Sequence, residues 1–315
     1  MGAQLRVYRR QIKSVQSTQK ITKAMELIAA SRIVKAQNRV NAARPYADEL
    51  TRALAALGQD ASLQHPLLTG AANPRRAGVL VVTSDRGLAG GYSANAIKRA
   101  NDLRASLRAE GKEPVLYVIG RKGVGYYRFR QIPTADSWTG FSEQPNFENA
   151  RAATDAVVSA LLATSDGESD GRPGIDELHV VYTRFDSMVS QTPVDDLVAP
   201  VRLSDADQAS QDAQSADGGS KTPAPAYEFE PEPQQLLTAL LPRYISARIF
   251  SALLESAASE SAARRRAMKS ASDNATDLIR TYTRMANQAR QAEITQEISE
   301  IVGGADALAA AGSDY

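Results

Sequence analysis

The chain has 315 residues, of which 43% are hydrophobic but only 6% aromatic, and its formal net charge is +1. It contains no cysteine, so disulfides, thiolate catalysis and cysteine-based metal sites are excluded. The two histidines, His65 and His179, lie far apart in the sequence, which argues against a zinc site or a histidine-based triad.

The first 44 residues predict one long basic helix. They contain no proline, and ten lysines and arginines stand against a single acid, Glu26. Apolar residues recur every three or four positions, and a helix of this length rises about 65 Å. We expect Pro45 to kink the helix or to be absorbed by it, and we place the N-terminal coiled-coil helix at residues 1–57. A basic rod suits acidic protein partners, with nucleic acid as the competing interpretation.

The middle of the chain predicts a small α/β domain at residues 76–203. Residues 78–83 and 114–119 are continuous apolar runs of the kind that form buried parallel strands. A helical stretch at 94–108 joins them into a βαβ unit. A helix at 147–163 and strands at 178–182 and 190–201 follow, the last at a sheet edge because it contains two prolines.

Two acidic, glycine-containing segments interrupt this region. Residues 164–177 carry five acids and one arginine, which predicts an exposed, solvated loop with a regulatory role. Residues 204–230, rich in Asp, Ser, Gln and Gly, predict a flexible connector.

The C-terminal segment, residues 231–315, predicts a second long helix. No proline follows Pro242 and no glycine occurs before Gly303, so residues 243–302 form a rod of about 90 Å. Small residues between 246 and 276 allow close approach of a partner helix. We expect Ile294, Ile298 and Ile301 to pack toward that partner and Pro242 to introduce a kink.

The predicted fold class is therefore α/β, a long antiparallel coiled coil of N- and C-terminal helices with an inserted Rossmann-like α/β domain. The segment 84–91 follows a strand and precedes a helix, where nucleotide-binding loops lie. Its glycines match neither the dinucleotide fingerprint nor the phosphate loop, so a structural turn is favoured. Arg264–Arg266 fan around a helix and cannot form one flat basic face for nucleic acid. We find no catalytic constellation, and expect no cofactor and no metal.

Several segments resemble the F-type ATP synthase γ subunit family, in the actinobacterial form. Residues 289–305 are similar to the family's C-terminal signature, and residues 19–31 to its N-terminal segment. Residues 84–91 and 231–248 resemble its central loop and the start of its last helix, so the likeness covers nearly the whole chain. The loop at 164–177 and the connector depart from the common pattern by their length.

The resemblance implies the rotor shaft that couples proton-driven rotation to ATP synthesis on other subunits, with no chemistry of its own. The implied partners are the α and β subunits, the ε subunit and the ring of c subunits, without nucleic acid. Membrane contact is expected only through partners, because no apolar run approaches the roughly 20 residues of a bilayer span. The expected location is the cytoplasmic side of the cell membrane, as a peripheral protein.

The resemblance also implies two sets of partner contacts. Met25 corresponds to a position that faces a β-subunit loop, with Lys20 and Lys23 close by. The family's upper shaft contact corresponds to four residues near the C-terminus: Arg290, Gln291, Thr295 and Glu297. Two alternatives remain at this point, a self-associating coiled-coil scaffold and a small-molecule enzyme that uses the α/β domain.

Overall fold

The computed structural model describes residues 2–57, 65–201 and 232–312. The chain divides into two compact units. One is formed by residues up to Ile28 together with residues from Arg265 onward, and the other by Ala29–Arg264. The connector predicted at 204–230 lies outside the described residues.

Two helices of unusual length carry much of the chain. Helix α1 spans Gly2–Leu57 and helix α7 spans Pro233–Gly312. Each contains one proline, Pro45 in α1 and Pro242 in α7, and neither proline ends its helix. A proline removes one backbone hydrogen bond of the helix. Packing of apolar side chains before and after the proline stabilises the helix despite this loss.

The second unit contains a five-stranded sheet with the order β3-β2-β1-β6-β7. Strands β1, β2, β3 and β6 are parallel and β7 pairs antiparallel with β6 at the edge. The strands are β1 (Arg76–Val82), β2 (Glu113–Ile119), β3 (Asp136–Trp138), β6 (Glu177–Phe185) and β7 (Gln191–Ala199). The helices are α2 (Pro66–Thr69), α3 (Tyr92–Ala109), α4 (Arg121–Phe129) and α5 (Phe147–Ala163). The α/β class predicted from the sequence is confirmed.

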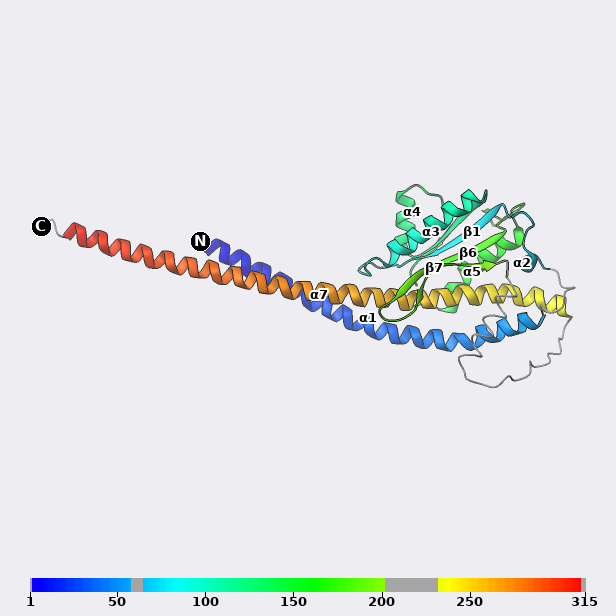
Figure 1. Ribbon diagram of the computed structural model, residues 1–315, viewed down its shortest axis with the longest axis horizontal. Helices are drawn as coiled ribbons and strands as arrows, with labels where there is room; N and C mark the ends of the chain where they lie inside the picture. Colours follow the sequence, from blue (N-terminus) through cyan, green and yellow to red (C-terminus); the bar gives the residue numbers. More distant parts are fainter. Residues whose placement is uncertain (1, 58–64, 202–231, 313–315) are drawn as a thin grey trace. The chain divides into compact units, whose positions relative to one another are not determined.

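Successive side chains along the strands point to opposite faces of the sheet and are buried in two hydrophobic cores, one on each face. Leu80, Val82 and Tyr117 face the core that α5 and the first part of α7 complete. Val79 and Val81 face the core beneath α3 and α4. Figure 1 shows these helices on the two sides of the sheet. Burial on both faces explains why the strands are continuous apolar runs rather than alternating ones.

The first part of α7 is a core helix of this unit. Leu237, Leu241, Ile245 and Ile249 are fully buried in the same cluster as the sheet. Fully burying such a side chain contributes about 1.5–3 kcal/mol. Within the described residues, α7 is also the one helix that could cross a membrane by length and composition, and 44% of its most apolar window is buried.

The acidic loop at 164–177 is more ordered than its composition suggests. It forms a short hairpin of β4 (Glu168–Ser169) and β5 (Arg172–Pro173). Asp176 is buried, and its carboxylate accepts hydrogen bonds from the backbone N–H groups of Arg75, Arg76 and Ser165 at 2.7–3.1 Å. The prediction that all five acids are solvated was therefore wrong, because one of them anchors the loop. The regulatory role stays a prediction.

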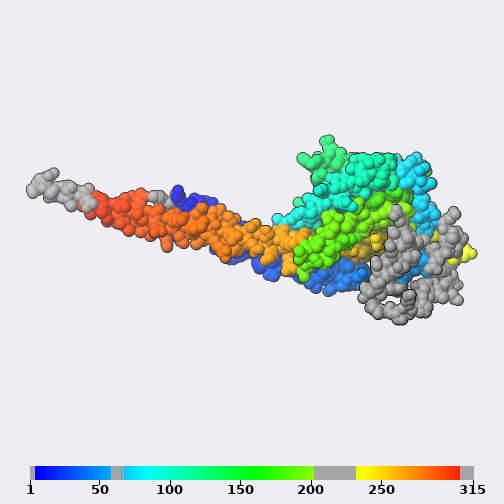
Figure 2. All heavy atoms as spheres, viewed as in Figure 1, coloured from blue at the N-terminus to red at the C-terminus, as the bar shows by residue number. Residues whose placement is uncertain are grey.

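In the first unit, α1 and α7 run antiparallel with a register set by polar side chains. Gln19 donates to Thr276 at 2.7 Å, and the hydroxyls of Thr22 and Ser272 share a buried hydrogen bond of 2.7 Å. This register places the start of α1 opposite about residue 293 of α7. The rest of α7 therefore continues without α1 beside it, as Figure 2 shows for the red end of the chain.

The C-terminal isoleucines do not pack toward the partner helix, contrary to the prediction. Ile294, Ile298 and Ile301 are 48%, 55% and 71% exposed. The apolar residues do recur on one face of α7, as predicted. The helix register places them beyond Gly2, where α1 begins, so α1 does not cover them.

The turn between β2 and α4 supplies a testable constraint. Gly120 has φ of +99°, and a Cβ at this residue would lie 2.1 Å from the carbonyl oxygen of Thr83. We expect Gly120→Ala to lower the free energy of unfolding by about 2–4 kcal/mol, through backbone strain and overpacking. Urea unfolding followed by fluorescence of Trp138, the single tryptophan of the chain, measures this.

Gly125→Ala is the matched control, because no heavy atom lies within 4 Å of its Cβ position in α4. We expect this variant to be as stable as the wild type or more stable by up to about 1 kcal/mol. Equal effects of the two substitutions would contradict the assigned role of Gly120.

Candidate functional site

The carboxyl ends of the parallel strands are where an α/β sheet of this kind offers a binding crevice. The chain passes from β1 through β2 to β3 on one side, and then crosses to β6 on the other side of β1. The crevice therefore opens between the ends of β1 and β6. In nucleotide-binding proteins of this class, the ligand lies at this position.

Helix α7 fills that crevice with its own polar side chains. Ser259 donates from its hydroxyl to the carbonyl oxygen of Thr183 at 2.9 Å, and the Thr183 N–H donates to the Ser256 hydroxyl at 3.4 Å. Glu260 follows on the same helix and is fully buried. Burial raises the pKa of the Tyr92 hydroxyl, which lies beside Ser256 and Thr183. The crevice is thus part of the packed fold.

The loop after β1 is held by the carboxylate of Asp85 at the start of helix α4. Asp85 accepts hydrogen bonds from the backbone N–H groups of Arg121, Gly140 and Ser142 at 2.8–3.1 Å. Arg121 is the first residue of α4, so the carboxylate meets the positive end of that helix. Burial opposes ionisation of Asp85, but these hydrogen bonds outweigh it and hold the pKa below its ordinary value. These hydrogen bonds hold the loop at 84–91 within the fold.

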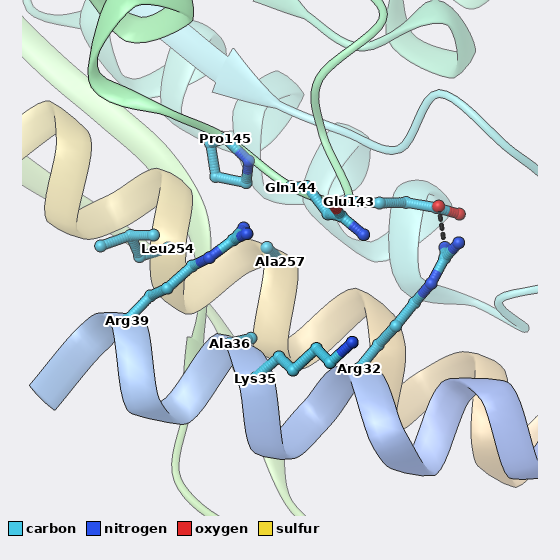
Figure 3. A pocket seen from close by; sticks show the side chains of 9 residues that line it. All are labelled: Arg32, Lys35, Ala36, Arg39, Glu143, Gln144, Pro145, Leu254 and Ala257. Carbon is cyan, nitrogen blue, oxygen red and sulfur yellow. Dashed lines mark hydrogen bonds and ion pairs between the residues drawn. The ribbon is translucent and has the colours of Figure 1, made fainter.

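An ion-pair cluster of Arg32, Glu143, Glu260 and Arg264 lies next to this loop. Arg264 contacts Glu260 at 2.7 Å and Glu143 at 3.3 Å, and Arg32 reaches from α1 to the other oxygen of Glu143. Figure 3 shows Arg32 directed at Glu143. Burial raises the pKa of Glu260, and Arg264 beside it opposes the rise. We call these four residues the junction cluster.

Sequence reasoning missed the junction cluster apart from Arg264. A glutamate in the Ala- and Ser-rich part of α7, four residues before an arginine, was the available signal for a buried pair. Glu143 gave no signal, since its role depends on a loop conformation. Arg264 is buried while Arg266 is exposed, so the three consecutive arginines form no common basic face, in line with helix geometry.

The predicted partner-contact residues lie on the surface of the first unit. Lys20 and Lys23 are exposed on α1 and Met25 is half-buried, while Lys23 pairs with Glu26 at 3.0 Å. The other four are exposed on α7, where the Thr295 hydroxyl donates to the Gln291 carbonyl at 2.9 Å.

The helix register does not bring the two sets of contact residues together. Residue 20 lies opposite about residue 275, on the order of 20 Å along the axis from Arg290. They are two separate surfaces on one rod. In the described part of the chain, no group of three or more potential metal ligands is found.

A sequence profile of the ATP synthase family matches residues 4–308. The chain is 57% identical to the ATP synthase gamma chain of Salinispora arenicola over the full length of both chains. It is 55% identical to that of Mycolicibacterium smegmatis, over 98% of this chain and 99% of the relative. The chain belongs to the ATP synthase gamma chain family. The relatives are mostly from actinobacteria, as the sequence resemblance implied.

Solved structures of ATP synthase assemblies contain chains that share the fold at low sequence identity. A chain of the Euglena gracilis mitochondrial ATP synthase, in an assembly of OSCP, F1 and c-ring, has a TM-score of 0.65 and 18% identity. The similarity covers all of this chain and 97% of that one. A chain from the rotor of the same enzyme has a TM-score of 0.61 and 16% identity, over 93% of this chain and 100% of that one. The fold of this chain is therefore shared with chains of these assemblies.

The hydrogen bonds to Asp85 predict a pH-dependent contribution to stability. Because the pKa of Asp85 is lowered on folding, its stabilisation is present above the ordinary Asp pKa of about 3.9 and is lost as the pH falls through the folded value. We expect Asp85→Asn to lower the free energy of unfolding by about 1–3 kcal/mol at pH 7. The deficit should shrink below pH 4. Urea unfolding at pH 7 and at about pH 3 measures both values.

Asp102→Asn, on the exposed surface of α3, is the matched control and should leave the free energy of unfolding nearly unchanged. A deficit for Asp85→Asn that does not change with pH would contradict the role of the charged carboxylate.

Proposed function

We propose that the chain is the central rotor shaft of a proton-translocating F-type ATP synthase and performs no bond chemistry itself. Membership of the gamma chain family supports the first part. The filled crevice at the end of the sheet supports the second, because the position where this fold class binds nucleotides is occupied by α7 and Asp85. ATP is then made or hydrolysed on other subunits, and the shaft transmits rotation.

The observation that carries the proposal is the exposed apolar end of α7. Ile294, Ile298, Ile301 and Val302 lie beyond the start of α1 and are 48–71% exposed. Apolar side chains repeated along one lone helix end call for a partner that surrounds it. A sleeve formed by a hexamer of α and β subunits satisfies this requirement and lets the helix turn inside it.

The remaining partners follow from the same assignment. The proposed shaft comprises residues 1–57 and 231–315, the domain at 76–203 contacts the ε subunit and the c-ring, and residues 204–230 connect them. Among solved structures with this fold, one is described as the central stalk and c-ring of the Tetrahymena thermophila enzyme. The chain is placed at the cytoplasmic side of the cell membrane as a peripheral protein, with membrane contact only through partners.

Two surfaces of the rod are assigned to the β subunit. Lys20, Lys23 and Met25 form the lower contact on α1. Exposed ion pairs contribute only about 0–1 kcal/mol each, so these lysines adjust the coupling and do not hold the assembly together. Arg290 and Gln291, with Thr295 and Glu297, form the upper contact on α7.

Reconstitution tests the assignment. Purified α and β subunits are mixed with this chain, and the mixture is separated by size before ATP hydrolysis is measured. The proposal expects one complex that contains all three chains and hydrolyses ATP with rotation of this chain. A chain that only associates with itself would indicate a scaffold. An isolated chain protected from heat by a nucleotide would indicate an enzyme.

The upper contact gives a quantitative prediction. A hydrogen bond to a charged group contributes about 1.5–3 kcal/mol, so its loss slows the step that it supports by roughly ten- to a hundredfold. We expect Arg290→Ala or Gln291→Ala to lower ATP turnover and synthesis while the complex still assembles. Turnover of the purified complex, with subunit content checked on a gel, measures the effect.

Arg284→Ala and Gln288→Ala are matched controls, since both residues are exposed on α7 before the proposed contact. We expect these variants to turn over ATP at the wild-type rate. Normal turnover in Arg290→Ala, in Gln291→Ala and in the double variant would rule out the upper contact.

A further inference from the structure

Glu143 is a single carboxylate shared by arginines from three parts of the second unit. Arg32 comes from α1 and Arg264 from α7. Arg86 comes from the loop after β1, and its guanidinium lies 3.6 Å from the Glu143 carboxylate. Glu143 itself belongs to the loop between β3 and α5. Its side chain is 13% exposed, so solvent screens these pairs only weakly.

The loop that carries Glu143 is fixed to the end of the sheet. Asp85 holds the N–H groups of Gly140 and Ser142 on one side of Glu143. On the other side, Asn146 caps α5 by accepting the N–H of Asn149 at 2.7 Å. The Glu143 carboxylate is therefore attached to the α/β domain through both flanks of its loop.

Arg264 connects the same site to the buried side of α7. Its guanidinium lies between Glu260 and Glu143 and also donates to the carbonyl oxygen of Gly87 at 3.3–3.4 Å. Its side chain is 7% exposed and that of Glu260 is fully buried. A buried charge that loses one partner is strongly destabilised, so both acids are needed to hold this arginine in one orientation.

A small cavity lies between the Glu143 loop and the two long helices, and Leu254 of α7 lines it beside smaller residues. Ala36 of α1 and Ala257 of α7 line a cavity of about 20 Å³ together with Arg32 and Glu143. Figure 3 shows Ala36 on α1 and Ala257 on α7, with the side chain of Arg32 extending from α1 toward Glu143. Van der Waals contacts of alanine have no preferred direction along or around a helix. The charge-assisted hydrogen bonds that Arg32 donates to Glu143 and Arg264 donates to Glu260 do have one, while Arg264 and Glu143 form an ion pair.

We infer that Glu143 fixes the rotational position of both long helices against the α/β domain, so that torque passes through Arg32, Glu143 and Arg264. Arg32 and Arg264 belong to the second unit, which comprises Ala29–Arg264. The inference rests on the proposed rotor function. It assigns to Glu143 the transmission of torque within the chain. Glu143 is a positioning residue that acts through the two arginines.

The test compares ATP hydrolysis with ATP-driven proton pumping in membrane vesicles that contain the complete complex. In Glu143→Gln, loss of a charged hydrogen bond should make slippage of the helices about tenfold more frequent. We expect hydrolysis to continue while the number of protons pumped per ATP falls by about twofold or more. Glu148→Gln, an exposed glutamate five residues along the chain, is the matched control and should pump like the wild type.

Arg32→Gln supplies a second variant that keeps the buried pair of Glu143 with Arg264. It should also lower the pumping ratio, and the double variant with Glu143→Gln should be no worse than Glu143→Gln alone, because Arg32 acts through Glu143. If Glu143→Gln does not assemble, Arg32→Gln decides the question by itself.

Two results would overturn the inference: an unchanged pumping ratio in Arg32→Gln, or an unchanged ratio in an assembled Glu143→Gln complex. If the Glu143→Gln complex pumps normally but melts at a lower temperature, Glu143 is merely structural. A wild-type chain that does not restore pumping to vesicles lacking it would instead reject the rotor function.

Discussion

One helix, α7, has to be a core element at its beginning and a free rod at its end, and this double requirement shapes the rest of the molecule. Its first turns bury Leu237, Leu241 and Ile245 against the sheet. Its middle part carries small residues and a buried ion pair, and within the described residues α1 does not extend along its last turns. The sheet depends on α7 for one of its two cores, so the α/β domain and the rod share the same hydrophobic contacts.

The same requirement explains why a fold known for nucleotide binding keeps so little of a nucleotide site. The crevice between β1 and β6 receives Ser256 and Ser259 from α7, and the helix start at α4 receives Asp85. Backbone N–H groups that bind phosphate in other proteins are satisfied here by the chain itself. The loops at this end of the sheet thereby become attachment points for the long helices.

Much of the fold could be predicted from the sequence, because its signals are local. Continuous apolar runs such as 78–83 marked strands buried on both faces, and the absence of proline and glycine marked the long helices. The seam of Ile294 and Ile298 was assigned wrongly, since periodicity shows that a helix has an apolar face but not whether a partner reaches it. Asp176 and Glu143 were beyond prediction, because each depends on a loop conformation that brings together residues distant in the sequence. The contact residues of the rod were inferred from family resemblance, and periodicity alone would not have selected them.

The hydrogen-bonded polar pairs between α1 and α7 determine the length over which the two helices overlap. Gln19 with Thr276 and Thr22 with Ser272 favour one overlap of the helices, because sliding by a few residues would break the hydrogen bonds between the two helices. The length of α7 that projects past α1 then depends on how many residues precede Gln19 in α1 and how many follow Thr276 in α7. Insertions or deletions near either terminus would lengthen or shorten the projecting tip without disturbing the overlap. The depth to which the tip reaches into a surrounding partner can therefore evolve independently of the packing that holds the two helices together.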